Sequence, residues 1–216
     1  MHGDRLPLQA RFHDIVSSED EIRQVIGVPS DRAAAKIVAA IDDNVRQFIA
    51  CAPFVFVASA SDSGLIDVSP KGDQPGFVQV LDDTTLAIPD RPGNRRIDTF
   101  RNVLCNPNVG IIFVIPGVTY TVRVRGKAII VRDLALREPM RVNGKLPEHA
   151  LVVDVLEVQA HCPKCMVRSG LWEPERWPDT TGLPTFAETL VAHSKVGETV
   201  EHMQAIVDAG NRERLY

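Results

Sequence analysis

The sequence predicts a mainly β protein of the α+β class, in which an antiparallel β-barrel is flanked by helices. Between residues 54 and 158 there are about seven short apolar runs joined by tight turns, too closely spaced for the long crossovers of parallel strands. Before and after this region, apolar residues recur at helical spacing instead. With 44% hydrophobic residues in a chain of 216, a sizeable core within one domain is expected.

The N-terminal part of the chain is predicted to be helical. Ser18 and Glu21 have the spacing of a capping box, and Gly27 and Pro29 end that short helix. Ser30 is predicted to begin a longer helix, whose apolar stripe would cover the core. The stripe consists of Ile37, Ile41, Val45 and Phe48.

The central region is predicted to contain the strands. Its apolar or alternating runs are 54–58, 65–69, 77–81, 84–88, 109–115, 118–125, 127–131 and 151–158. The first two form a hairpin around a turn-rich segment at 61–64, and Gly126 is expected to turn the chain between two further runs. On the run 118–125, Arg123 and Arg125 share one face. They lie either in solvent or against a partner that supplies acceptors.

Helices return after the strands and once between them. Ile97, Phe100 and Leu104 predict one short helix between strands. Pro163 fits the first turn of a helix that runs to about residue 169, and a second capping box starts at Thr185. The segment 172–184 is predicted to be a surface loop, and Gly197 a helix break. These elements predict an N-terminal helical extension packed on the barrel (1–50), the barrel with a closing helix (51–172), and C-terminal loop and helices in the same globular unit (173–216).

Bulk properties exclude several classes of protein. The net charge of −4 gives no basic footprint for nucleic acid or for an anionic membrane. No apolar run approaches the roughly 20 residues of a membrane span, and the first residues lack the apolar core of a signal peptide. We therefore expect a cytoplasmic protein with no nucleic-acid or membrane partner.

The four cysteines fit a reducing compartment. Cys51 and Cys105 stand alone in apolar surroundings and are predicted to be small core residues. Cys162 and Cys165 form a C-x-x-C pair, for which a structural role, a redox role and a metal-binding role are all open. A second pair of ligands at suitable spacing is lacking, so the sequence predicts no metal site.

Two polar segments are the candidates for binding chemistry. The segment 69–73 combines a hydroxyl, a cation and a glycine at the end of a strand, and the segment 90–96 concentrates three arginines just before a helix. Free N–H groups at a helix start and arginine side chains both suit a phosphate monoester. The alternative is a basic loop that is simply solvated.

Together these motifs resemble the FMN-binding members of the pyridoxamine 5′-phosphate oxidase-like family. The similar stretches are the FVFVASAS and DVSPKGD hairpin, LAIPDRPGNRR, NPNVGIIFVIPG and TVRVRGKA; HCPKCMVRSGLW is similar to a motif of an uncharacterised FMN-dependent branch. The resemblance implies a six-stranded antiparallel split β-barrel and a homodimer with FMN at the subunit interface. The C-terminal arginine and histidine pattern of the vitamin B6 oxidase itself is absent, which argues against pyridoxal phosphate synthesis.

The resemblance also implies which residues bind FMN. Phosphate contacts would come from Ser69, Lys71, Asn94 and Arg95 or Arg96, and backbone around Val68, Pro70, Pro89 and Asp90 would border the ring and ribityl chain. Further groups would come from Thr121, Arg123, His161, Lys164, Arg168 and Trp172, and the resemblance allows the last four to belong to the partner subunit. The implied function is an FMN-dependent oxidoreductase acting on an unknown small molecule, with no catalytic residue assigned. The alternatives are a flavoprotein that stores or senses FMN without catalysis, and a haem-binding relative on the same barrel.

Overall fold

The computed structural model describes residues 6–195 and 197–216, in two compact units that divide after Lys36. The described part of the first unit holds η1 (Leu8–Arg11), α1 (Glu19–Ile26) and α2 (Asp31–Ala34), and none of residues 6–35 is buried. The predicted start and end of α1 are confirmed: Ser18 Oγ accepts from the Glu21 N–H at 3.3 Å, and Gly27 follows with φ 77°. The packing of residues 1–50 on the barrel stays a prediction.

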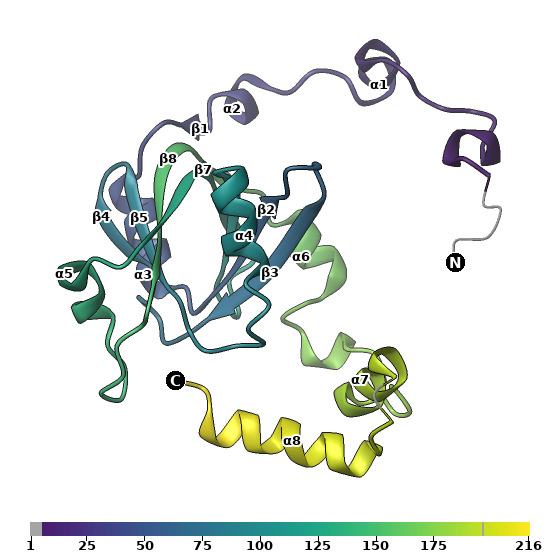
Figure 1. Ribbon diagram of the computed structural model, residues 1–216. Coiled ribbons are helices and arrows are strands. Elements are labelled where there is room, and N and C mark those ends of the chain that lie inside the picture. Colours follow the sequence, from purple (N-terminus) through teal and green to yellow (C-terminus); the bar gives the residue numbers. More distant parts are fainter. Residues whose placement is uncertain (1–5, 196) are drawn as a thin grey trace. The chain divides into compact units, whose positions relative to one another are not determined.

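The second unit is built on one curled antiparallel sheet (Figure 1). Its strands are β1 (Ile37–Val38), β2 (Phe54–Ala60), β3 (Ile66–Gly72), β4 (Gln79–Asp82), β5 (Thr85–Pro89), β6 (Asn108–Val114), β7 (Thr121–Val131) and β8 (Ala150–His161). They pair in the order β3-β2-β6-β7-β8-β5-β4, and β1 adds to β8. The predicted fold class is confirmed. The count of eight exceeds the predicted six because two strands, β1 and β4, are very short.

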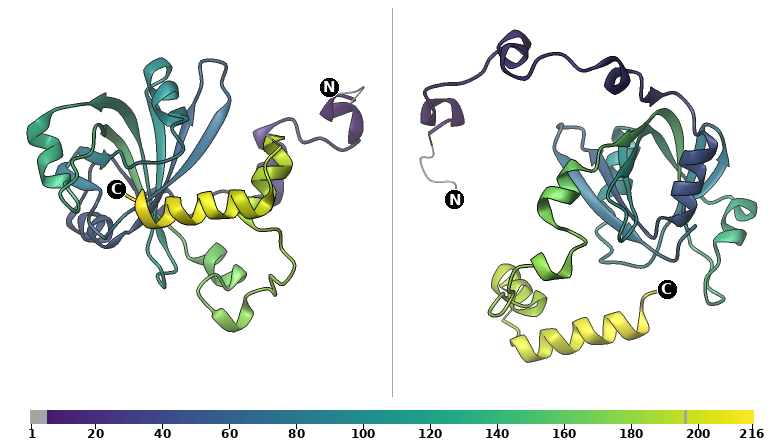
Figure 2. Two further views of the ribbon diagram at one scale, coloured as in Figure 1. Left: turned by 60° about the horizontal axis from the view of Figure 1, so that its bottom comes forward. Right: turned by 180° about the vertical axis from the view of Figure 1, so that it is seen from behind.

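The core lies inside the curl of this sheet. Val57 of β2, Ile111 and Phe113 of β6, and Val124 of β7 are all fully buried, as the alternation of strand side chains requires. Helix α3 (Asp43–Cys51) adds Ile49 to the same cluster. Figure 2 shows the curl of the sheet from two further sides. Because β3 and β4 form the two ends of the pairing order, the curl leaves an opening beside β3.

The predicted long helix from Ser30 to Phe48 is wrong. Helix α2 ends after four residues, and Ile37 and Val38 instead pair with Gln159 and Val158 of β8. A second helix, α3, starts anew because the Asp42 side chain accepts from the Val45 N–H at 2.8 Å. β-branched residues suit a strand better than a helix, and here the exposed edge of β8 supplies the pairing partner.

The predicted turn at Gly126 is also wrong, because β7 continues through it. Arg125 pairs with Glu157, whereas Gly126 pairs with Val155. Leu156 on β8 is therefore the extra residue of a β-bulge, and it is exposed. The glycine is needed for close approach: a Cβ at this position would overlap the carbonyl oxygen of Asp154.

The remaining helices lie between the strands and after them in the chain. They are α4 (Asp98–Cys105), α5 (Leu134–Arg137), η2 (Glu138–Met140), α6 (Lys164–Ser169), η3 (Pro174–Arg176), α7 (Phe186–Ser194) and α8 (Val200–Glu213). The capping box at Thr185 is confirmed at the start of α7. None of the helices within the described ranges has the length and apolarity to cross a bilayer.

The core assignment of two cysteines is wrong. Cys51 and Cys105 are the last residues of α3 and α4, and both are exposed, as are Cys162 and Cys165. Ile49 and Val103, each two residues before a cysteine, are buried near these helix ends. Each cysteine lies on the opposite face of its helix, since residues two apart on a helix point about 200° apart.

Candidate functional site

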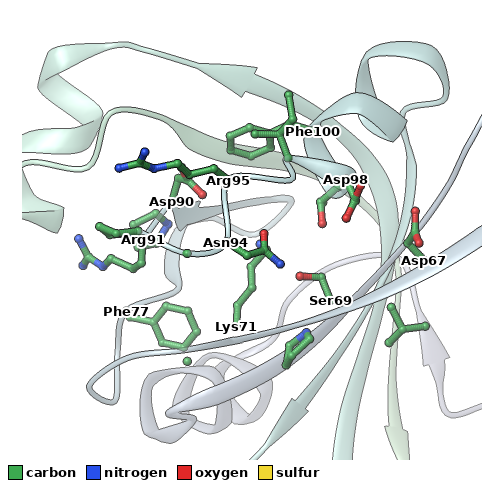
Figure 3. Close-up of a pocket in the computed structure, with 18 residues that line it drawn as sticks. Asp67, Ser69, Lys71, Phe77, Asp90, Arg91, Asn94, Arg95, Asp98 and Phe100 are labelled. Carbon is green, nitrogen blue, oxygen red and sulfur yellow. The ribbon is translucent and has the colours of Figure 1, made fainter. Parts of the chain in front are cut away.

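A cavity of about 640 Å³ lies beside β3, where the curl of the sheet is open (Figure 3). Its volume falls within the range of roughly 300–1,000 Å³ that small-molecule sites occupy. The second wall is the segment that links β5 to α4. Among the residues predicted to bind a ligand, those that line this cavity are Val68, Ser69, Pro70, Lys71, Pro89, Asp90, Asn94 and Arg95.

Strand β3 presents polar side chains to the cavity in strict alternation. Asp67, Ser69 and Lys71 share one face of the strand, because successive strand residues point to opposite sides. Figure 3 shows Ser69 and Lys71 rising from β3 toward the segment that carries Asn94. Burial lowers the pKa of Lys71, and the nearby Asp90 carboxylate opposes this effect.

Asp90 forms the opposite wall, just after β5. Its backbone N–H donates to the carbonyl oxygen of His149 at 2.9 Å, which fixes the segment against the start of β8. Burial raises the pKa of Asp90, while the charges of Lys71, His149 and Arg91 act in the other direction. The cavity thus holds a cation and an acid that are both partly removed from water.

The link between β5 and α4 has an unusual backbone. Arg95 and Ile97 have positive φ angles of 61° and 54°, a conformation that is costly for a β-branched residue such as isoleucine. Ile97 is the N-cap of α4 and gives no side-chain cap, so the first N–H groups of that helix lack the usual acceptor. Helix α6 also lacks a side-chain cap, whereas the N-termini of α1, α2, α3, α5, α7 and α8 are all capped by a side chain.

The two adjacent arginines of this link are placed differently. Arg95 lines the cavity, whereas Arg96 lies outside it with 70% of its side chain exposed. Arg96 Nε forms an ion pair with Asp98 Oδ2 at 2.8 Å. The sequence could not choose between Arg95 and Arg96. In the structure Arg95 faces the cavity and Arg96 does not.

A buried amide ties α4 to the hairpin of β2 and β3. Asn102 Nδ2 donates to Ser59 Oγ at 3.0 Å and to Asp67 Oδ2 at 2.7 Å. Asn102 and Ser59 are both buried. Asp67 is one of the acids that border the cavity, so this hydrogen bond links α4 to the β3 wall of the cavity.

A second polar cluster lies beside the cavity and shares Arg91 with its lining. The Asp73 side chain, only 1% exposed, accepts from Arg91 Nε at 2.5 Å and from Tyr216 Oη at 2.7 Å. Arg91 also donates to the Met140 carbonyl oxygen at 2.9 Å and lies over the Tyr216 ring. Because Asp73 follows β3 and Arg91 follows β5, this cluster joins the two walls of the cavity.

This cluster should make the stability of the protein depend on acid pH. Burial raises the pKa of Asp73, but hydrogen bonds from Tyr216, the Gln74 N–H and Arg91 outweigh it and hold that pKa below its ordinary value. The folded state therefore gains stability from Asp73 at neutral pH, and loses it as the pH falls below the ordinary aspartate pKa of about 3.9. We expect Asp73→Asn to be less stable at neutral pH, with the difference shrinking in acid.

Urea unfolding of the wild type and Asp73→Asn across a pH series measures this difference. Other carboxylates with lowered pKa, such as Glu188 in its capping box, titrate equally in both proteins and cancel in the comparison. A gap between the two proteins that stays constant with pH would show that the Asp73 charge contributes nothing to folding.

The other predicted ligand-binding residues lie on another part of the barrel. Thr121 and His161 are directly opposite each other on β7 and β8, and Arg123 donates to Gln159 in the next pair on the same face. Trp172 Nε1 donates to the Val118 carbonyl oxygen at 3.0 Å. Lys164 and Arg168 follow on α6, one turn apart.

Within one chain, the length of strand β8 separates the cavity residues around Lys71 and Asp90 from the residues around Thr121 and His161. Pro89, beside the cavity, pairs with Ala150 at the start of β8, whereas His161 is its last residue. The strand has 12 residues, which at about 3.3 Å per residue makes it up to roughly 36 Å long. The structure therefore brings the residues around Lys71 and Asp90 together, but it does not bring those around His161 to the same cavity.

The family model described as pyridoxamine 5′-phosphate oxidase matches residues 41–162, more than half of the chain. The chain belongs to this family. The match covers the residues of the cavity together with Thr121, Arg123 and His161, and it ends at Cys162, before Lys164, Arg168 and Trp172. No curated protein matches the chain significantly in sequence.

Several solved structures are similar to this family member in part. HupZ of Group A Streptococcus is 18% identical, with a TM-score of 0.46 over 56% of this chain and 98% of that one. An FMN-binding protein from Syntrophomonas wolfei is 10% identical, with a TM-score of 0.43 over 53% and 82%. A protein related to general stress protein 26, from Clostridium acetobutylicum, is 13% identical, with a TM-score of 0.40 over 55% and 85%. Likenesses this distant say nothing of what the chain binds.

Sequence reasoning missed some residues of the site in this pyridoxamine 5′-phosphate oxidase family member. Asp67 could have been found, because it lies two residues before Ser69 on a strand and must share its face. Tyr216 could not, since 143 residues separate it from Asp73. Among the described residues, no group of three or more His, Cys, Asp or Glu side chains is placed to hold a metal ion.

Proposed function

We propose that the chain binds FMN, with the phosphate in the cavity between β3 and the start of α4. The observation that carries this proposal is the uncapped N-terminus of α4 beside a cavity lined by Lys71 and Arg95. Free N–H groups and the positive end of a helix favour an anion, and two cations add to the attraction. Ser69 and Asn94 supply further polar contacts on the same lining.

The acids near the cavity do not oppose a phosphate as strongly as their number suggests. Asp67 accepts a hydrogen bond from Asn102, and Asp98 pairs with Arg96. Burial raises the pKa of Asp90, which disfavours its charged form. Among the residues that the structure describes, Lys71 and Arg95 form no ion pair within 4.0 Å. These two cations are therefore the ones best placed to meet a dianion.

We also propose that a bound flavin would be used for redox chemistry on a small molecule, as expected of this family. The flavin would supply the electron transfer, and the protein would position it and exclude water. Backbone around Val68, Pro70, Pro89 and Asp90 would border the ring and the ribityl chain, because these residues line the same cavity. The absorbance spectrum of freshly purified protein, followed by reduction with a nicotinamide cofactor, distinguishes an enzyme from a flavin store.

FMN should bind more tightly than FAD. The proposed site holds a monophosphate at the start of α4, and the sequence has no glycine-rich turn that would accommodate a second phosphate. We expect at least a tenfold difference in Kd, about 1.4 kcal/mol, by titration calorimetry at one salt concentration. Tighter binding of FAD would show that the phosphate lies elsewhere.

A homodimer would complete the site. The outer face of the sheet carries a row of paired residues that runs from Pro70 through Phe56 and Ile112 to Arg123. Phe56 and Ile112 are each 39% exposed, and Val68 nearby is 60% exposed. Contiguous exposed apolar side chains beside a partly buried arginine fit a protein interface. The residues around Thr121 and His161 would then serve the partner's flavin, since β8 keeps them from the cavity of their own chain.

Arg123→Glu should therefore dissociate the dimer and release the flavin while leaving the barrel folded. Arg123 lies on the outer face, so the change removes no core contact, but it places a second acceptor against Gln159 and against the partner. Sedimentation of the flavin-loaded protein measures both effects. Arg125→Gln is the matched control, because it removes only an exposed ion pair with Glu157. A wild-type monomer that retains stoichiometric flavin would contradict the proposed interface.

A further inference from the structure

Neither cysteine of the C-x-x-C pair is among the residues proposed to bind FMN, and the geometry of the pair suggests a separate redox role. Strand β8 ends at His161 and α6 begins at Lys164, so Cys162 and Cys165 straddle the junction. All four cysteines of the chain are free and exposed. Only this pair is close in sequence, whereas Cys51 and Cys105 lie at the ends of separate helices.

The backbone of the junction brings the two cysteines close together. Pro163 has φ −75° and ψ −7°, in the right-handed helical region, and Lys164 is already helical. The Pro163 carbonyl oxygen accepts from the Val167 N–H at 3.0 Å, which fixes this turn. A four-residue segment with two central residues in this conformation has its end Cα atoms within about 7 Å. Disulfides span Cα separations of about 4.4–6.8 Å, so Cys162 and Cys165 are within reach of each other.

We propose that Cys162 and Cys165 form a reversible disulfide by exchange with small disulfides such as glutathione disulfide. One cysteine thiolate attacks the glutathione disulfide, forms a mixed disulfide and releases one glutathione. The second thiolate then attacks the protein sulfur of that mixed disulfide and releases the other glutathione. Two protein thiols are oxidised, one small disulfide is reduced, and the two protons end on the released glutathiones.

The charges around the pair suit such a reagent. Lys164 lies between the cysteines, and Arg168 lies one helical turn further on the same face; both are exposed. Glutathione carries carboxylates, so these two cations favour its approach. The disulfide is also compatible with the fold, because neither thiol packs in the core. The inference does not depend on whether the chain binds FMN.

Incubation of the full chain in glutathione buffers of increasing oxidised fraction tests the proposal. The intact oxidised protein should be lighter than the reduced protein by two hydrogen atoms, and after an acid quench and alkylation it should carry two alkyl groups instead of four. Peptide mapping should place the disulfide between Cys162 and Cys165, and reduced glutathione should reverse it. Flavin need not be present, so this readout is separate from the test of FMN binding.

Matched variants distinguish disulfide formation between Cys162 and Cys165 from the independent reaction of single thiols with glutathione disulfide. Cys162→Ser and Cys165→Ser should each hold one glutathione at the remaining cysteine of the pair, because the second step is blocked. The double variant Cys51→Ser and Cys105→Ser should still lose two thiols. The proposal is overturned if the wild type carries glutathione on separate cysteines without an internal disulfide, or if both cysteines of the pair stay alkylatable.

Discussion

Lys71→Met should weaken FMN binding by about ten- to a hundredfold, that is by about 1.5–3 kcal/mol, and should affect riboflavin far less. Lys71 is half-buried and faces the cavity from β3, and burial already lowers its pKa. A phosphate dianion beside the ammonium group of Lys71 would replace the water contacts that the lysine loses through burial. Riboflavin lacks the phosphate, so it would lose only packing against the lysine stem, which methionine largely replaces.

Two arginine variants give this experiment its internal control. Arg95→Ala should act like Lys71→Met, because Arg95 lines the cavity. Arg96→Ala should change FMN affinity little, because Arg96 lies outside the cavity and pairs with Asp98. Calorimetry with both ligands at one ionic strength measures all three variants. Equal losses of affinity for FMN and riboflavin in Lys71→Met would move Lys71 out of contact with the phosphate.

The sequence predicted elements well where a local signal decided the structure. The caps at Ser18 and Thr185 are hydrogen bonds between residues three apart, and both are present. The hairpin of β2 and β3 depends on a turn within a few residues, and it too is confirmed. Such contacts need no knowledge of the remaining chain, so composition and spacing are sufficient to find them.

Elements that depend on distant partners were predicted wrongly. Ile37 fits the predicted helical stripe, but Ile37 and Val38 instead pair as a strand with β8, more than a hundred residues later in the chain. For the site, the sequence found both polar segments, yet it could not choose between Arg95 and Arg96. Which of the two arginines faces the cavity depends on the path of the backbone through this link. Arg95 and Ile97 have positive φ there, and neither residue type indicates such a conformation.

The bulge opposite Gly126 is the largest feature that the sequence did not indicate, and it determines which side chains of β8 face outward. Before the bulge, Val153 and Val155 point into the core; after it, Val158 does, and Gln159 lies on the outer face with Arg123. One extra residue shifts the alternation of a strand. Without it, His161 and Gln159 would leave the face that carries Thr121 and Arg123.

Gly126→Ala should therefore destabilise the protein by about 3 kcal/mol, the upper end of the usual cost of overpacking, because the new Cβ would meet backbone that cannot move aside cheaply. The new Cβ would overlap the Asp154 carbonyl oxygen and lie 2.8 Å from Val153 Cγ1. Gly110→Ala on β6 is the matched control, because its Cβ would meet only the Ala58 Cβ at 3.9 Å, and its effect should stay within about 1 kcal/mol. Urea unfolding of both variants measures the difference. If Gly126→Ala were as stable as Gly110→Ala, β7 and β8 could separate at the bulge without cost, and the bulge could not be what holds Gln159 and His161 beside Arg123 and Thr121.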